Sequence, residues 1–353
     1  LADLSGYCML ISNKMKTPAP WCNVLANPDF GSLISESGSM CTWWGNSSEN
    51  RLTPWNNDAV LDKTGEAIYL RDEETGNSWS LTPLPRPDDL PYRVTHSIGE
   101  SLFEHNSQGL EQRLQVFVDS EKPLKVMRIR LVNKWPRVRR LTVTFAVEWL
   151  IGNSFSYERH LLVSERDEET GALMVRNAFP RHSQEELAFI ASDLPAHSVS
   201  CDGREFFGKA WSWEAPAGLA SVGLSDRVEP SSHPCGVYQV HVELQEEQVL
   251  EFHFVLGAAE NLPIARKLIA QASNIEWVEE RHRLLMQGWE RILGTWAITT
   301  PDIATDAMIN KWLLYQVVSS RLWGRIGFYQ ASGGFGFRDQ LQDVLALLDT
   351  SPE

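Results

Sequence analysis

The hydrophobic pattern of the chain changes once, near Asn261, and this change constrains the fold more than any other feature. Before it, apolar and polar residues alternate over many short segments, a pattern typical of strands with one buried face. The clearest alternating segments are residues 113–118, 127–131, 141–149, 238–244 and 250–256. Many strands separated by turns, with no helix between them, predict a large antiparallel β-sandwich.

After Asn261 the apolar residues recur at helical spacing. Asn261 can cap a helix and Pro263 suits an early helical position, so we expect a helix from about residue 262. A second apolar stripe predicts another helix over residues 277–293. Further on, we expect Thr300 to cap a third helix, with Pro301 at its first position and Asp302 complementing the helix dipole.

A glycine-rich aromatic loop, residues 327–337, leads into a last helical segment. The polar residues that open that segment include Arg338, Asp339, Gln342 and Asp343. Arg338 with Gln342, and Asp339 with Asp343, stand four residues apart, which predicts neighbouring pairs on the helix surface. A guanidinium, two carboxylates and amides beside aromatic rings can recognise the hydroxyls and faces of a sugar. The same residues also suit a plain solvent-exposed helix start with an internal salt bridge.

The apolar residues of this last segment are also spaced as on one face of a helix, and we expect them to face a core. They are Leu341, Val344, Leu345 and Leu348.

A second polar and aromatic stretch lies near the N-terminus, where Trp44, Asn46, Glu49 and Arg51 occur within eight residues. Such a stretch can be a packed aromatic loop whose polar groups satisfy its own backbone.

Composition excludes several classes of function. The net charge of −14 argues against a nucleic acid or an anionic membrane as partner. The five cysteines have no Cys-x-x-Cys spacing, so we expect reduced thiols, a cytoplasmic setting and no metal site. No apolar run reaches the roughly 20 residues of a membrane helix. The chain begins at Leu1 and ends at Glu353 with features expected of an internal piece of a longer protein.

Residues 336–343, Gly-Phe-Arg-Asp-Gln-Leu-Gln-Asp, resemble the signature of the inverting phosphorylases of glycoside hydrolase family 94. A second stretch agrees with this resemblance, Ala-Asn-Pro-Asp-Phe-Gly at residues 26–31 followed by Trp-Gly-Asn-Ser-Ser-Glu-Asn-Arg-Leu-Thr-Pro-Trp at residues 44–55. Within the family, the sequence of these two stretches is most similar to that of cyclic β-1,2-glucan synthases and 1,2-β-oligoglucan phosphorylases. Cellobiose-cleaving members carry an arginine where this chain has Gly333, which favours the β-1,2 branch.

The resemblance implies a β-sandwich, a helical linker and the first helices of an (α/α)6 barrel. On this plan residues 1–20 are an N-terminal segment, and residues 21–260 are an antiparallel, galactose-mutarotase-like sandwich. Residues 261–298 are then the helical linker, and residues 299–353 are the start of a truncated barrel. A truncated barrel should leave the apolar stripes around Trp312 and Leu345 partly uncovered.

The resemblance also implies phosphorolysis of a β-1,2-glucan, with inorganic phosphate as co-substrate, α-glucose 1-phosphate as product and no cofactor. Arg338 and Asp339 match the family residues that hold the glucosyl unit. Gln342 and Asp343 are expected to support them, and the loop with Trp44, Asn46, Glu49 and Arg51 is expected to reach over the sugar.

The family's general acid and phosphate ligands match no residue here, so we expect this piece alone to be inactive. Two alternatives stay open: a non-catalytic carbohydrate-binding sandwich module, or an inverting glycoside hydrolase with the same barrel. The resemblance leaves a homodimer open, and it allows membrane and glycosyltransferase segments elsewhere in a longer parent protein.

Overall fold

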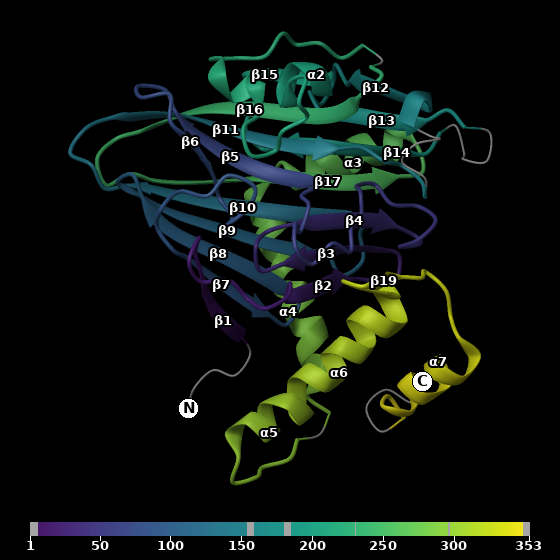
Figure 1. The fold of residues 1–353 in the computed structure, drawn as a ribbon. Coiled ribbons are helices and arrows are strands. Elements are labelled where there is room, and N and C mark those ends of the chain that lie inside the picture. The colour runs from purple at the N-terminus through teal and green to yellow at the C-terminus, as the bar shows by residue number, and fades with distance from the viewer. Residues whose placement is uncertain (1–5, 154–158, 180–184, 230, 296, 349–353) are drawn as a thin grey trace.

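A computed structural model describes residues 6–153, 159–179, 185–229, 231–295 and 297–348. Within these residues two large antiparallel sheets lie face to face, and helices follow them in the sequence (Figure 1). The sandwich and the order of elements predicted from the hydrophobic pattern are therefore confirmed.

The first sheet has nine strands among the described residues, and each strand is antiparallel to its neighbours. In spatial order they are β1 (Gly6–Ile11), β7 (Tyr92–Ser97), β8 (Glu100–Ser107), β9 (Leu110–Val118), β10 (Leu124–Asn133), β17 (Val249–Ala259), β14 (Leu187–Ser192), β13 (Leu173–Asn177) and β12 (Leu162–Arg166). Strand β1 lies inside residues 1–20, yet it pairs with β7 along its whole length. The domain boundaries at residues 20, 260 and 298 stay predictions.

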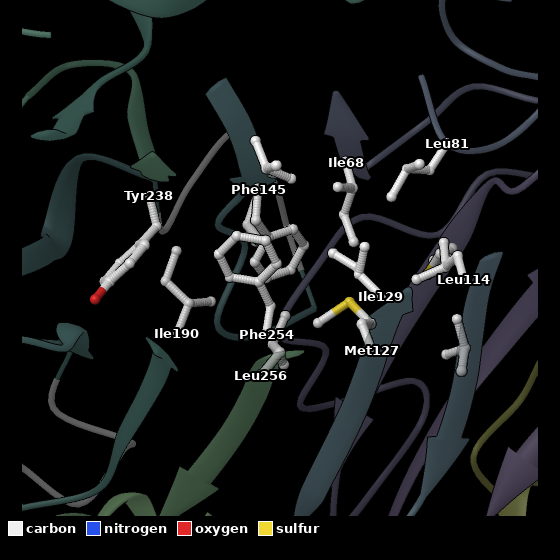
Figure 2. Close-up of a cluster of buried hydrophobic side chains, with 14 of the residues drawn as sticks. Ile68, Leu81, Leu114, Met127, Ile129, Phe145, Ile190, Tyr238, Phe254 and Leu256 are labelled. Carbon is white, nitrogen blue, oxygen red and sulfur yellow. The ribbon is translucent and has the colours of Figure 1, made fainter. Parts of the chain in front are cut away.

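The second sheet has five strands among the described residues. In spatial order they are β15 (Ser198–Asp202), β16 (Pro234–Leu244), β11 (Arg139–Glu148), β5 (Glu66–Asp72) and β6 (Ser78–Ser80). Its inward side chains meet those of the nine-stranded sheet in the main core, where the rings of Phe145 and Phe254 lie 5.5 Å apart (Figure 2).

A third sheet, formed by β2 (Cys22–Ala26), β3 (Phe30–Ser35) and β4 (Met40–Trp44), packs against strands β7 to β10 of the nine-stranded sheet and against β5. The side chains of Leu25, Phe30 and Ile34 pack into the main core. Alternate residues on the same strands, Val24 and Leu33, face a separate cluster that contains residues from the C-terminal part of the chain. This small sheet therefore connects the sandwich to the segment that contains the predicted site.

The three sheets meet at a buried ion pair. The ammonium of Lys125, on β10, contacts the carboxylate of Glu66, on β5, and both side chains are fully buried. The hydroxyl of Thr42, on β4, accepts a hydrogen bond from Lys125 at 2.7 Å and donates one to Glu66 at 2.6 Å. A buried charge is tolerated only when it is paired and hydrogen-bonded, and this arrangement meets both conditions.

Two helices cover the outer face of the nine-stranded sheet: α3 (Leu262–Ala272) and α4 (Ile275–Leu293). The cap expected at Asn261 is confirmed, because its side chain accepts a hydrogen bond from the backbone N–H of Ile264 at 3.1 Å. The Arg281 guanidinium on α4 binds both carboxylate oxygens of Asp119, at 2.6 and 2.7 Å. The smaller helices on the sandwich are η1 (Arg159–Leu161), α2 (Gly203–Phe207) and η2 (Ala217–Ala220).

The next helical segment begins away from the sandwich and runs back toward its three-stranded sheet (Figure 1). It consists of α5 (Ile303–Ala307), the π-helical η3 (Met308–Trp312), α6 (Leu313–Gln316) and the π-helical η4 (Val317–Gly324). The expectation that Thr300 caps it is wrong. Asp302 is the cap and accepts a hydrogen bond from the Ala304 N–H at 3.0 Å, while the Thr300 hydroxyl donates to the Asp302 carbonyl.

The chain then forms a short hairpin, β18 (Ile326–Gly327) and β19 (Gln330–Ala331), and the final helix α7 (Phe337–Leu345). The expectation that Leu341 and Leu345 face a core is wrong for this chain, since they are 55% and 61% exposed. Val344 and Leu348 are exposed as well. The uncovered stripe expected around Leu345 is confirmed. No helix among the described residues is long and apolar enough to cross a membrane.

Candidate functional site

The hairpin that precedes α7 is fixed against the three-stranded sheet. Ile326 and Phe328 are buried in a cluster with Val24, Leu33 and Trp43. Tyr315, on the preceding helix, is also buried, and its hydroxyl donates to the Asn23 side chain at 2.8 Å. The start of the glycine loop therefore has a defined position on the sandwich.

Arg325 holds the beginning of this loop to the sandwich. Its backbone is in the left-handed region, with φ of 50°, and this conformation ends helix η4. Its guanidinium donates to the Gly45 carbonyl at 3.0 Å, and its own carbonyl accepts hydrogen bonds from the Ser47 hydroxyl at 3.4 Å and the Gly333 N–H at 3.3 Å. The ring of Phe335 lies 4.8 Å from the guanidinium carbon, within the range of a cation–π contact.

Asn46 makes the second connection between the sandwich and the glycine loop. Its side-chain oxygen accepts hydrogen bonds from the N–H groups of Ser48 and Glu49, at 2.8 and 3.0 Å, so it shapes its own turn. Its amide nitrogen donates to the Gly333 carbonyl at 2.9 Å. Gly333 has a φ of 61°, and a Cβ there would lie 2.0 Å from the Asn46 oxygen. Only glycine fits this contact without a shift of the loop.

The other three residues of the sandwich loop stay on the sandwich side. Trp44 is half-buried against the main core. Glu49 accepts a hydrogen bond from the Asn153 amide at 2.7 Å. Arg51 donates to the Ser47 carbonyl at 2.8 Å and lies 5.3 Å from the ring of Trp55. Of the four loop residues named from the sequence, the structure brings only Asn46 into a hydrogen bond with the glycine loop.

Arg338 and Asp339 form the start of α7, and Gly336 occupies the position before it. Both side chains are exposed, at 85% and 54%, and their closest nitrogen–oxygen distance is 3.4 Å. This is a loose contact on the surface, and most of the donors of Arg338 face solvent. A guanidinium and a carboxylate placed in this way can exchange water for the hydroxyl groups of a ligand.

The predicted surface pairs of α7 differ from those observed. Asp343 is paired with Arg321 of η4, at 3.0 Å, and this ion pair ties α7 to the preceding helix. Gln342 is exposed, and Arg338 contacts Asp339 instead of Gln342. The expected pairing at four-residue spacing is therefore wrong, because a residue from another helix lies closer to Asp343.

Two features of the site were not found from the sequence. Arg325 and Ser47 join the two loops, but they stand 278 residues apart and belong to no motif that links them. A left-handed backbone at Arg325 also has no sequence signal, since arginine rarely takes this conformation.

The described residues contain no group of three or more histidine, cysteine, aspartate or glutamate residues that could hold a metal ion. All five cysteines are free. Burial raises the pKa of the Cys41 thiol to about 12, so this thiol stays protonated at neutral pH.

The fold defines a class of protein: a large β-sandwich followed by a helical linker and the opening helices of a second domain. The exposed Arg338–Asp339 pair lies in the last of these helices. A bacterial glucoamylase solved with acarbose has a similar fold: the match covers 91% of this chain and 44% of the glucoamylase chain, with a TM-score of 0.50 and 9% identity. At that identity the likeness concerns the fold alone.

The family follows from the sequence. The family model of the glycosyl hydrolase 94 supersandwich domain matches residues 5–275, and that of the glycosyl hydrolase 94 superfamily catalytic domain matches residues 288–353. The chain belongs to glycosyl hydrolase family 94.

The chain is similar to two relatives of known name. A cyclic beta-(1,2)-glucan synthase, NdvB of Rhizobium meliloti (strain 1021), is 33% identical over 99% of this chain and 12% of its own length. A 3-O-beta-D-glucopyranosyl-beta-D-glucuronide phosphorylase of Paenibacillus borealis is 28% identical over 95% of this chain and 42% of its own length. The chain thus spans less than half the length of these relatives.

Proposed function

We propose that this chain forms the sandwich and the glucosyl-holding helix start of an inverting glycoside phosphorylase that acts on β-1,2-glucan. Family membership supports this proposal, as do similarities to a glucan synthase and to a phosphorylase. The observation that carries it is the hydrogen bond between Asn46 and Gly333. This bond fixes the glycine loop four residues before an exposed helix start that presents Arg338 and Asp339.

In the proposed reaction a phosphate oxygen attacks the anomeric carbon from the face opposite the leaving sugar. The glycosidic C–O bond breaks, its electron pair moves to the leaving oxygen, and a general acid protonates that oxygen. The products are α-glucose 1-phosphate and a shortened glucan. By family resemblance, the acid and the phosphate ligands belong to sequence outside these 353 residues, so the chain alone should bind sugar without turning it over.

Arg338 and Asp339 have complementary roles in this proposal. The guanidinium donates paired hydrogen bonds to sugar hydroxyls, and the carboxylate accepts hydrogen bonds from them. Bonds to a carboxylate strengthen as positive charge develops on the ring, so Asp339 should stabilise the transition state more than the ground state. Asp343, held by Arg321, keeps α7 in place.

The test uses the full-length protein with a β-1,2-glucooligosaccharide and inorganic phosphate, and measures α-glucose 1-phosphate. We expect Asp339→Asn to lower kcat/KM about a thousandfold or more, mainly through kcat. The control is Asp89→Asn, which changes an exposed carboxylate of the β6–β7 connection and should leave both constants unchanged. A folded full-length protein that forms no sugar phosphate from this substrate would contradict the proposal, and a change in KM alone would limit Asp339 to binding.

A further inference from the structure

The flank of the sandwich contains a cavity of about 780 Å³ whose lining includes neither Arg338 nor Asp339. It lies between the β4–β5 connection, the end of β11 and the segment that follows α2. Its volume falls within the range of about 300–1,000 Å³ that is typical of ligand sites. Its lining includes three tryptophans, Trp55, Trp211 and Trp213, together with Asn56 and Arg51.

Two of the tryptophans are held firmly by the protein. The ring of Phe207 lies 4.7 Å from that of Trp211 and 4.4 Å from that of Trp213. The fully buried Tyr69 donates its hydroxyl proton to the Trp213 carbonyl at 2.7 Å. Burial raises the pKa of Tyr69 above its ordinary value, which keeps this donor protonated. The rings therefore have little freedom to collapse into the cavity.

The backbone of Trp211 is in the left-handed region, with φ of 52°. A bulky residue rarely takes this conformation, and it costs roughly 1–2 kcal/mol. The conformation is supported by close packing, since a Cβ on Gly203 would lie 2.5 Å from the Trp211 ring. Strained residues of this kind occur at ligand sites more often than elsewhere.

The polar part of the lining suits a neutral ligand. Asp62, Glu148 and Glu214 contribute carboxylates, and Arg51 and Lys63 contribute cations. A nearly balanced set of charges favours neither a strong anion nor a strong cation. Indole rings beside mixed donors and acceptors match a ligand with apolar ring faces and many hydroxyls.

Two donors in the wall also lack partners. The indole nitrogen of Trp55 and the amide nitrogen of Asn56 are shielded from solvent, and neither has a hydrogen-bond partner among the described residues. A buried donor without an acceptor costs roughly 1–3 kcal/mol. Asn56 also lines the cavity, so a ligand oxygen that reaches its amide nitrogen accepts this hydrogen bond and recovers the cost.

We propose that this cavity binds a segment of glucan chain by stacking sugar rings on Trp211 and Trp213, at a distance from the bond that is cleaved. The choice of glucan as the ligand rests on the proposed function, whereas the binding itself does not require turnover. Arg51 lines the cavity and donates to Ser47, whose hydroxyl contacts the Arg325 carbonyl. The cavity and the glycine loop therefore share one loop of the sandwich.

The test measures binding of a β-1,2-glucopentaose to the 353-residue chain by titration calorimetry. We expect Trp211→Ala and Asn56→Leu each to weaken binding about tenfold, through loss of stacking and loss of a donor. The matched control is Trp21→Phe, at a 40% exposed tryptophan outside the cavity, which should bind like the unaltered chain. Thermal unfolding of each variant identifies those that are folded.

The outcomes separate this inference from the proposed function. Binding that Trp211→Ala and Asn56→Leu weaken, and that the control Trp21→Phe keeps, supports the cavity even if the full-length protein makes no sugar phosphate. Binding that only Asp339→Asn removes places the glucan at the start of α7 and overturns the inference. It is also overturned if folded chain binds no pentaose, or if the two cavity variants bind as tightly as the control.

Discussion

The side-chain amide of Asn46 donates a 2.9 Å hydrogen bond to the carbonyl of Gly333, which follows it by 287 residues. The bond joins a loop of the small β2–β3–β4 sheet to the loop that leads into α7. It gives the exposed Arg338 and Asp339 a fixed starting point on the sandwich.

Gly333→Ala should disturb this connection. Its φ of 61° and the 2.0 Å approach of a new Cβ to the Asn46 oxygen force the loop to move. We expect a local loss of roughly 1–2 kcal/mol from backbone strain alone, read as faster hydrogen exchange in residues 327–336. The control is Gly334→Ala, where the nearest atom to a new Cβ is 3.8 Å away. Equal exchange rates in the two variants would contradict the role of the contact.

Lys125→Met should destabilise the sandwich by about 3–5 kcal/mol, because it leaves the fully buried Glu66 carboxylate without its cation. Adding Glu66→Gln should recover a large part of this loss. The Thr42 and Thr53 hydroxyls, which donate to Glu66 at 2.6 and 2.8 Å, can donate to an amide oxygen as well. Chemical denaturation measures both free energies of unfolding. If the single and double variants were equally stable, the buried charge would not be the cause.

His96 should make the protein lose stability in mild acid. Burial lowers its pKa to about 4 from an ordinary value of 6.5, while a hydrogen bond with the Trp21 carbonyl opposes this shift. The neutral ring is satisfied on both sides, by that carbonyl at 3.0 Å and by the Ser101 hydroxyl at 2.8 Å. Below pH 6.5 the unfolded chain therefore takes up a proton that the folded chain refuses.

This contribution of His96 is present in full above pH 6.5 and is lost as the pH falls toward 4, by on the order of 3 kcal/mol. His96→Gln should reduce the slope of unfolding free energy against pH in that window. His160→Gln, at an exposed position, should keep the slope of the unaltered chain. The interpretation fails if both variants keep the same slope.

Leu341→Ser combined with Leu345→Ser should reduce aggregation of the chain without lowering its stability. Both side chains are more than half exposed on α7, so they contribute little buried area. Light scattering during heating measures the aggregation, and the melting temperature measures the stability. Leu268→Ser, at a residue only 5% exposed in the core, should lower the melting temperature by several degrees. A comparable drop in the α7 variant would show that its leucines are packed.

Much of the sandwich could be predicted because alternation along a strand is a local property. The segment 141–149 was expected as a strand, and β11 (Arg139–Glu148) buries Leu141, Val143 and Phe145 in the main core. The cap at Asn261 was also predictable, since a cap and its N–H partner are three residues apart. The prediction that Thr300 caps the next helix was wrong for an equally local reason. Asp302, two residues later, offers a stronger acceptor to the helix N-terminus and displaces the helix start.

The site was predictable only in part. The resemblance of residues 336–343 selected Arg338 and Asp339, and the structure places them side by side on the surface. The partner of Asp343 was not predictable, because Arg321 belongs to another helix. Nor was the cavity with Trp55, Trp211 and Trp213, whose lining comes from segments more than 150 residues apart.

The sequence by itself determined the periodicity of the clearest strands and helices, the helix cap at Asn261 and the family to which the chain belongs. These depend on residues a few positions apart, whose spacing is fixed by backbone geometry. Only the tertiary structure decided that Asn46 meets Gly333 and that the third sheet supports the glycine loop. Contacts between such distant residues depend on how the sheets pack, and no local pattern records that packing.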